Sequence, residues 1–184
     1  MKRETIKNIL NFLKEKENKE FPENFNLIHE LETHPDGAQY RYEGDLYLND
    51  FNITKLPNDL HVTGALNLYR CQQLTELPDN LYVGENFILY RCKKITGLPN
   101  DLYIGGSLNL SDNNDLTELP DNLHVGRWLD LRRCRQITEI PNNLFVARDF
   151  FIANTPLADK YTNVKLRKMI KSKGGTIIGK IIRE

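Results

Sequence analysis

Residues 56–76 read Leu56-Pro57-Asn58-Asp59-Leu60-His61-Val62-Thr63-Gly64-Ala65-Leu66-Asn67-Leu68-Tyr69-Arg70-Cys71-Gln72-Gln73-Leu74-Thr75-Glu76. This stretch is one copy of a repeat, because the next copies place prolines at positions 78, 99, 120 and 141, each 21 residues after the last. Self-similarity at a fixed period of this size is typical of a solenoid, in which each repeat forms one coil stacked on its neighbour. We therefore predict a repeat solenoid.

Each repeat carries two short runs of alternating apolar residues, separated by a glycine-containing corner. In the quoted copy these runs are the pairs Leu60/Val62 and Leu66/Leu68. A period of two predicts a strand with one buried face, so each coil should contribute two strands. With a third apolar group near Leu74, a coil presents about six large apolar side chains, each worth roughly 1.5–3 kcal/mol when buried. A single coil cannot cover that surface, so the prediction is a mainly β stack of coils.

One column of the repeat holds Cys71, Cys92, Asn113 and Cys134. The segment Leu110-Ser111-Asp112-Asn113-Asn114-Asp115-Leu116-Thr117-Glu118-Leu119-Pro120 resembles the Leu-x-Leu-x-x-Asn segment of leucine-rich-repeat proteins, closed by Leu-x-x-Leu-Pro. The resemblance covers roughly residues 21–157. The repeat is similar to the Leu-Pro-rich repeats of bacterial and bacteriophage-encoded members. It implies that the side chains of this column turn inward and satisfy backbone groups at a bend. The extra strand before the glycine corner departs from the standard repeat, so we expect a shape approaching a parallel β-helix.

The length of 184 residues predicts a single domain over residues 1–184. Residues 1–20 are expected to form an N-terminal cap helix, and a helix that binds a partner is the alternative. Residues 21–157 should form a six-coil solenoid with an insertion at 28–42, and residues 158–184 a C-terminal cap of helix and strand. Because insertions in repeat proteins often project from the binding face, we expect this one to reach the first coils.

The C-terminal cap is predicted from its own local pattern. Residues 161–173 read as a helix with Thr162 at its N-cap, and two glycines at 174 and 175 end it. Residues 176–182 are rich in isoleucine and should form one short strand.

Charge and cysteine content limit the function classes. The chain has 25 basic and 25 acidic residues, so it should have no bulk attraction to nucleic acid or membranes. We expect no signal peptide and no membrane span. The three cysteines share one column and are predicted to be buried, reduced thiols of a cytoplasmic protein; a disulfide between Cys71 and Cys92 is the alternative.

No catalytic motif is present, and we predict neither an enzyme nor a cofactor. His29 and His34 are five residues apart, rather than the four that place two zinc ligands on one helical face. His61 and His124 share a column but lie three coils apart, roughly 14 Å at strand spacing, which is too far for one metal. No metal site is therefore predicted.

Two outward columns are the candidates for function. One is aromatic in every member and predicts a ladder of stacked rings: His61, Tyr82, Tyr103, His124 and Phe145. That ladder either stabilises the coils or contacts a partner. The second column and its neighbours combine Tyr, Trp and Arg, which are enriched at interface hot spots. The candidate partner-binding residues are Tyr40, Arg41, Tyr42, Tyr47, Tyr69, Arg70, Tyr90, Arg91, Trp128 and Arg132.

These patterns favour a non-enzymatic binding protein that contacts another protein through its repeat surface. The resemblance to bacteriophage members implies that the partner is a host protein, such as a defence component. The alternative is that the insertion and the first coils sequester a nucleotide-like small molecule, since a mixed Tyr/Arg stripe also suits phosphate. A solvated basic edge without a ligand is the third interpretation.

Overall fold

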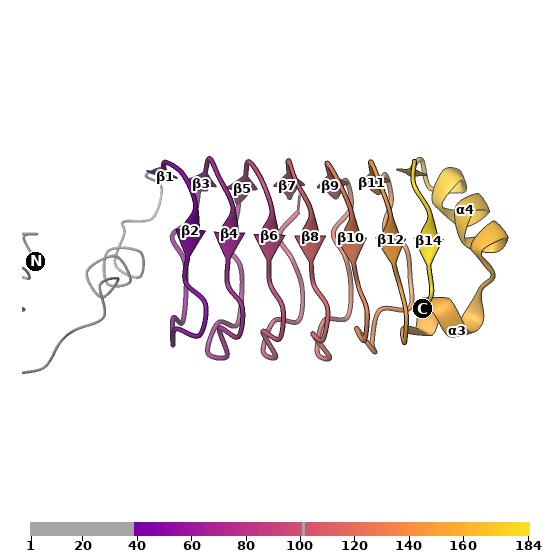
Figure 1. Cartoon of the computed structure of the whole chain (residues 1–184), viewed down its shortest axis with the longest axis horizontal. Helices are drawn as coiled ribbons and strands as arrows, with labels where there is room; N and C mark the ends of the chain where they lie inside the picture. The colour runs from indigo at the N-terminus through magenta and orange to yellow at the C-terminus, as the bar shows by residue number, and fades with distance from the viewer. Residues whose placement is uncertain (1–38, 101) are drawn as a thin grey trace, which may run out of the picture.

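The computed structural model describes residues 39–100 and 102–184. It is a solenoid of stacked coils built on two parallel sheets of seven strands each (Figure 1). This confirms the predicted mainly β repeat solenoid that approaches a parallel β-helix. The predicted N-terminal cap helix at 1–20 and the insertion up to residue 38 lie outside the described residues.

Each coil gives one strand to each sheet, and consecutive coils pair in parallel. The first sheet, sheet A, contains β1 (Tyr40–Tyr42), β3 (Leu60–Val62), β5 (Tyr82–Val83), β7 (Tyr103–Ile104), β9 (His124–Val125), β11 (Phe145–Val146) and β13 (Thr176–Ile177). The second, sheet B, contains β2 (Leu46–Tyr47), β4 (Leu66–Asn67), β6 (Phe87–Ile88), β8 (Leu108–Asn109), β10 (Leu129–Asp130), β12 (Phe150–Phe151) and β14 (Ile181–Ile182). Val62 pairs with Tyr42 and with Val83, so the same repeat position meets itself in every coil.

The core lies between the two sheets and runs along the solenoid. The alternating apolar residues of both strands point into it, and Leu60, Val62, Leu66 and Leu68 are all 0 % exposed. Period-two patterning therefore identified the inward face of strands β2 to β12 correctly.

Tyr40–Tyr42 form strand β1, although the sequence analysis placed them in the insertion. Tyr40 aligns with Leu60 and Tyr42 with Val62. Both tyrosines are partly buried and pack against the core, while Arg41 between them is exposed. The two tyrosines thus occupy inward positions that Leu, Val and Ile hold in later coils.

At Gly105 and Gly126, on the corner between the sheets, the neighbouring coils approach one another closely. A Cβ added to Gly105 would lie 2.1 Å from the Gly84 carbonyl oxygen, and one on Gly126 would lie 2.1 Å from that of Gly105. A backbone this close leaves no room for any side chain.

The inward column of Cys71, Cys92, Asn113 and Cys134 is confirmed, and all four residues are 0 % exposed. The thiols are free. Each Sγ donates a hydrogen bond to a backbone carbonyl oxygen of the preceding coil, at 2.9–3.0 Å. Asn113 Nδ2 instead donates to the carbonyl oxygens of Leu89 and Leu110, at 2.6 and 2.9 Å.

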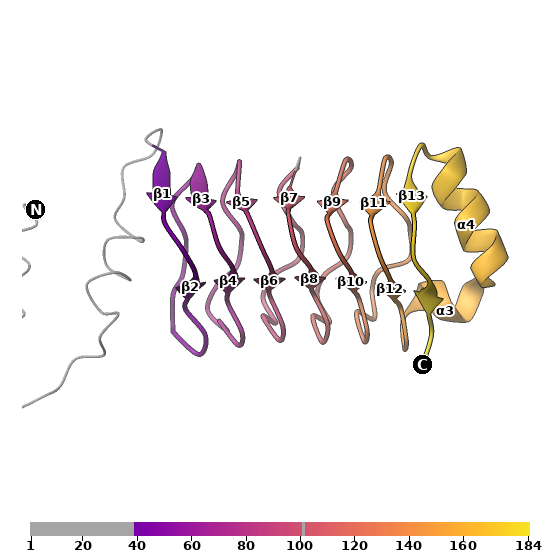
Figure 2. The same ribbon diagram turned by 45° about the horizontal axis from the view of Figure 1, so that its top comes forward.

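Two helices, α3 (Pro156–Lys160) and α4 (Asn163–Ser172), lie at the C-terminal end of the stack (Figures 1 and 2). The predicted helix with Thr162 as N-cap is confirmed, because the Thr162 side chain accepts a hydrogen bond from the Lys165 amide. Leu166 and Ile170 are its buried residues. Within residues 39–100 and 102–184, no helix is long and apolar enough to cross a membrane.

The prediction of one strand over residues 176–182 is wrong. This segment forms two strands, β13 and β14, with Gly179 at the corner between them. A Cβ on Gly179 would lie 2.4 Å from the Arg148 carbonyl carbon, so this glycine serves the same close approach as those of earlier coils. The repeat therefore continues past residue 157, with α3 and α4 inserted before its last pair of strands.

Candidate functional site

A tight bend follows each of the strands β2, β4, β6, β8, β10 and β12 of sheet B and precedes the repeat position of the Cys/Asn column. One residue of every bend has a left-handed backbone, with φ between 57° and 62°: Asp50, Arg70, Arg91, Asp112, Arg133 and Asn154. We call this column the arginine corner. A left-handed conformation costs most L-residues roughly 1–2 kcal/mol, and only Gly, Asn and Asp adopt it readily.

A second left-handed column lies at a bend that we call the proline corner, two residues after the proline in the repeats that carry one. Its described members are Asp59, Asn80, Asn122, Asn143 and Gly174, with φ between 53° and 79°. Every one belongs to a residue type that tolerates this conformation. The arginine corner differs, because three of its six members are arginines in a conformation that arginine disfavours.

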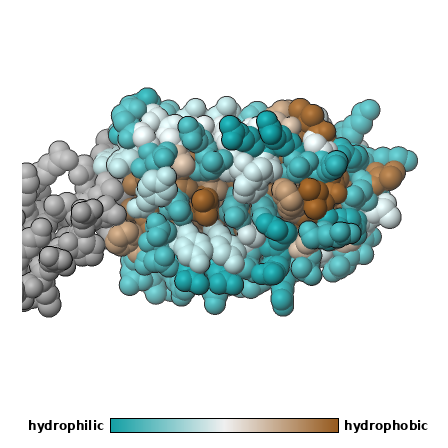
Figure 3. Space-filling model, viewed as in Figure 1, coloured by the Kyte–Doolittle hydropathy of each residue, from teal (hydrophilic) through white to brown (hydrophobic). Residues whose placement is uncertain are grey.

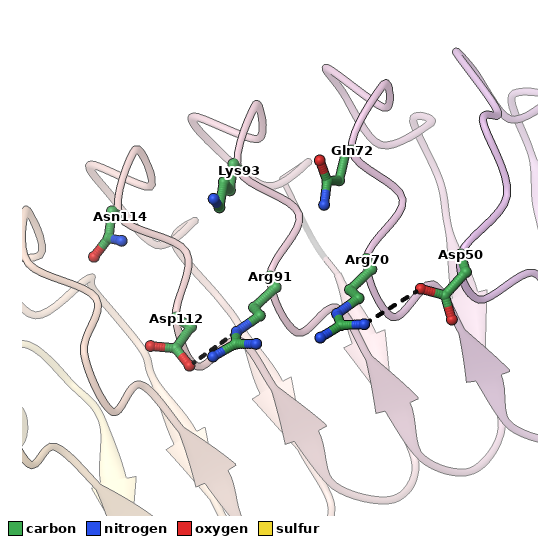
Figure 4. Close-up of a pocket in the computed structure, with 7 residues that line it drawn as sticks. All are labelled: Asp50, Arg70, Gln72, Arg91, Lys93, Asp112 and Asn114. Atoms are coloured by element: carbon green, nitrogen blue, oxygen red, sulfur yellow. Dashed lines mark ion pairs between the residues drawn. The ribbon is translucent and has the colours of Figure 1, made fainter.

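The first four members of the arginine corner form a row of charges in the order Asp50, Arg70, Arg91, Asp112 (Figure 4). The Arg70 guanidinium lies 4.0 Å from the Asp50 carboxylate, and that of Arg91 lies 3.5 Å from Asp112. Asp112 also pairs with Arg133 at 3.3 Å. The two guanidinium groups in the middle of the row are therefore neighbours of like charge.

A groove of about 450 Å³ runs along this row and opens to solvent. Its second wall is the column that follows the cysteines, formed by Gln72, Lys93 and Asn114 (Figure 4). Arginine side chains that are 43 % and 40 % exposed thus face the groove from one side, and an exposed lysine from the other.

Two tyrosines support the arginines. The rings of Tyr69 and Tyr90 stack with centroids 5.4 Å apart. The Arg70 guanidinium carbon lies 4.9 Å from the Tyr69 ring centroid, and that of Arg91 lies 5.1 Å from Tyr90. Cation–π contacts of this length stabilise exposed pairs by about 0.5–1 kcal/mol and limit the motion of the guanidinium groups.

The Asp112 carboxylate is held in its charged form. Its partial burial acts to raise its pKa, but the Tyr90 hydroxyl and the positive charges of Arg133 and Arg91 outweigh this, so the pKa lies below its ordinary value. The same hydrogen bond to Asp112 raises the pKa of Tyr90. The negative charge at this end of the groove is therefore committed to neighbouring cations.

The other predicted site residues do not join this groove. Arg132 is bound to Asp130, with its guanidinium nitrogens 2.6–3.0 Å from the carboxylate oxygens, and lies over the Phe151 ring. Trp128 packs edge-on against the same ring, with centroids 6.2 Å apart. Both residues pack on Phe151, and Arg132 also lines a second open pocket that includes Tyr90 and Asp112.

Residues from the start of the chain are also placed elsewhere. Tyr40, Arg41 and Tyr42 belong to sheet A, whereas Tyr69 and Arg70 follow a strand of sheet B. Arg41 aligns with His61 and pairs with Glu43. Tyr47 is 52 % exposed on sheet B, and its hydroxyl donates to Asp45.

The aromatic ladder of sheet A is present as predicted. Neighbouring rings from His61 to Phe145 are nearly parallel, with centroids 4.2–5.2 Å apart. Stacked pairs of this kind contribute about 0.5–1.5 kcal/mol each beyond their buried area. The ladder therefore stabilises the stack of coils through its own contacts.

Sequence reasoning missed Asp50, Lys93 and Asp112 as members of the site. The two aspartates share the repeat column of Arg70 and Arg91, so reading that column from coil to coil would have found them. The left-handed backbone of Arg70 and Arg91 could not be predicted from the sequence, because arginine is not a residue type that favours this conformation.

The face formed by sheet B is mostly hydrophilic, with small separate hydrophobic patches (Figure 3). Within residues 39–100 and 102–184, no three His, Cys, Asp or Glu side chains gather as a metal-binding group. Comparisons with protein families, with characterised proteins and with solved structures give no match for this chain.

Proposed function

We propose that this chain is a non-enzymatic binding protein that contacts another protein through the arginine corner and the Tyr69/Tyr90 pair. The observation that carries the proposal is the arrangement of two Tyr–Arg pairs in adjacent coils, stacked on one another beside an open groove. Tyrosine and arginine dominate interface hot spots because they offer large, amphipathic contact area. Their mutual stacking reduces the side-chain entropy that binding would otherwise cost.

The shape of the surface supports a macromolecular partner. The groove is open along its length, and its lining is polar and charged. Small-molecule sites are typically concave and mostly apolar. An open row of side chains on rigid coils instead suits a partner that lies across several repeats, as solenoid proteins commonly bind.

The repeat resembles bacterial and bacteriophage leucine-rich-repeat proteins, and this resemblance supports a host protein, for example a defence component, as the partner of a cytoplasmic binding protein. The second candidate function is capture of a phosphate-bearing small molecule. The cations of the groove favour this function. We place the phosphate at Arg70 and Arg91; the third candidate arginine from the first coils, Arg41, lies on sheet A and does not face the groove.

The experiment is affinity capture from bacterial lysate with three forms of the protein. Wild type is compared with the double variant Tyr69→Ser/Tyr90→Ser and with Arg127→Ala/Arg148→Ala, which removes two exposed arginines from the glycine corner. We expect wild type and the arginine control to enrich the same protein, and the tyrosine variant to lose it. Equal capture by all three forms would contradict the proposed face, and no enriched protein would contradict the function.

A further inference from the structure

The order of charges along the arginine corner is unusual for a purely structural row. Equivalent positions of adjacent coils lie about 4.8 Å apart, so each side chain has one neighbour on either side. If signs alternated, every charge would have an opposite neighbour. Here two carboxylates flank two guanidinium groups, and Arg70 lies beside Arg91 (Figure 4). The fold therefore holds two positive charges together.

Lys93 adds a third positive charge to the same groove. It is exposed and lines the groove opposite Arg91 (Figure 4). Within residues 39–100 and 102–184, its ammonium group has no hydrogen bond or ion pair. An excess of cations in one groove, with one of them unpaired, creates a local positive potential that attracts anions.

The backbone gives an independent reason to assign these arginines to binding. At the proline corner every described left-handed position is occupied by Asp, Asn or Gly. At the arginine corner Asp50, Asp112 and Asn154 follow the same preference, whereas Arg70, Arg91 and Arg133 do not; Arg133 pairs with Asp112 at the end of the row. Disfavoured residues at strained positions are concentrated in functional sites, where their side chains serve a purpose other than stability.

We propose that the groove between Asp50 and Asp112 binds a phosphate group, with Arg70 and Arg91 as its two guanidinium donors and Lys93 as a third cation. Guanidinium groups bind tetrahedral oxyanions through paired N–H donors, and an ammonium adds a point charge. A dianion placed between the two arginines also relieves their mutual repulsion. Asp50 and Asp112 are positioning residues that hold the guanidinium groups in the row.

This inference rests on the proposed binding function, because it names the chemical group that the corner receives. The phosphate belongs either to a phosphorylated side chain of a protein partner or to a free small molecule. Tyr69 and Tyr90 lie next to the arginines and would contact the remainder of either ligand.

The test measures thermal unfolding of the full chain with inorganic phosphate, against sodium chloride of equal ionic strength. Ligand that binds only the folded state raises the melting temperature. We expect phosphate to stabilise wild type, and Arg70→Asn or Arg91→Asn to weaken phosphate binding by about tenfold or more, the effect of one lost charge-assisted contact. Arg127→Asn is the matched control and should behave as wild type.

Asparagine is the chosen replacement because it tolerates the left-handed backbone, so the variants should fold. Absence of a phosphate-specific shift in wild type would overturn the proposal. An equal loss in Arg127→Asn would also overturn it, because the effect would then reflect general charge.

Two further ligands identify the source of the phosphate. If a phosphoserine peptide binds more tightly than inorganic phosphate, and Tyr69→Ser removes that gain, the ligand is a phosphorylated protein. If instead adenosine diphosphate binds more tightly than inorganic phosphate, and Tyr69→Ser removes that gain, the ligand is a small molecule. Both results support the site. Should protein capture depend on Tyr69 and Tyr90 while phosphate has no effect, the inference fails and the proposed function stands.

Discussion

The Asp130 carboxylate, which is 1 % exposed, is bound by the Arg132 guanidinium two residues further along the chain, with a closest approach of 2.6 Å. Asp130 also accepts a hydrogen bond from the Arg132 amide at 2.9 Å. In equivalent positions Asn67 and Asn109 accept the same backbone hydrogen bond from Tyr69 and Ser111. Arg132 is therefore committed to a buried partner, which distinguishes it from the arginines of the groove.

Removal of Arg132 should destabilise the fold, because it leaves a buried carboxylate without its counter-ion. We expect Arg132→Ala to lower the free energy of unfolding by about 1–3 kcal/mol. In an Asp130→Asn background, where no charge is buried, the same substitution should cost less than about 0.5 kcal/mol. Urea unfolding of the four proteins completes the cycle, and equal costs in both backgrounds would contradict this role.

The burial pattern of strand β1 predicts that Tyr42 contributes to stability and that Arg41 does not. Tyr42 packs against the core, so Tyr42→Ala should lower the free energy of unfolding by roughly 1–3 kcal/mol. Arg41 is exposed, and Arg41→Ala should stay within about 0.5 kcal/mol of wild type. Denaturant unfolding of both variants checks the strand. If the arginine variant proved the less stable of the two, the assignment of β1 would be wrong.

The buried thiols predict a loss of stability at high pH. Burial raises the pKa of Cys71 and Cys134 to about 12 and that of Cys92 to about 11, from 9.0. The unfolded chain therefore releases these protons first, so the stability that the neutral thiols provide is complete below pH 9.0 and is lost as pH rises towards 12. Each thiol contributes a slope of about 1.4 kcal/mol per pH unit in that range.

The control for this slope is the variant in which all three cysteines are alanine. It should show a shallower decrease of unfolding free energy above pH 9.0 than wild type. In addition, a maleimide at pH 8 should label the wild-type thiols only after unfolding. Identical slopes in both proteins, or rapid labelling of the folded one, would count against burial of the column.

Asn113 offers a stabilising substitution. Its Oδ1 is buried and has no hydrogen-bond partner in the described structure. Cysteine at this position would remove that atom and could donate to the Leu89 carbonyl, while Cys134 already donates to Leu110. We expect Asn113→Cys to raise the free energy of unfolding by about 1 kcal/mol. A decrease of that size in chemical denaturation would show that the amide is worth more than its unpaired oxygen costs.

The repeat and its inward residues could be predicted from the sequence because burial selects apolar residues with a period of two. The first strand could not, since Tyr40 and Tyr42 replace the aliphatic residues that mark this position in later coils. The final pair of strands was read as one because Gly179 is the only sign of the corner between them.

Residue type also identified Arg70 and Arg91 as site residues, but it could not separate them from Arg132. That distinction depends on which side chain meets a buried carboxylate and which bends have a left-handed backbone. Both are properties of neighbouring coils brought together by folding. The repeat column of an arginine therefore indicates its role better than its residue type does.

The central claim is that Arg70 and Arg91 are retained for binding and not for stability. Their exposed ion pairs are worth about 0–1 kcal/mol each and their cation–π contacts about 0.5–1 kcal/mol each, while their left-handed backbone costs roughly 1–2 kcal/mol each. The most direct measurement is the free energy of unfolding of Arg70→Asn/Arg91→Asn without ligand. We predict a value equal to or above that of wild type; a decrease of more than about 2 kcal/mol would show that the arginines hold the fold together and would contradict the claim.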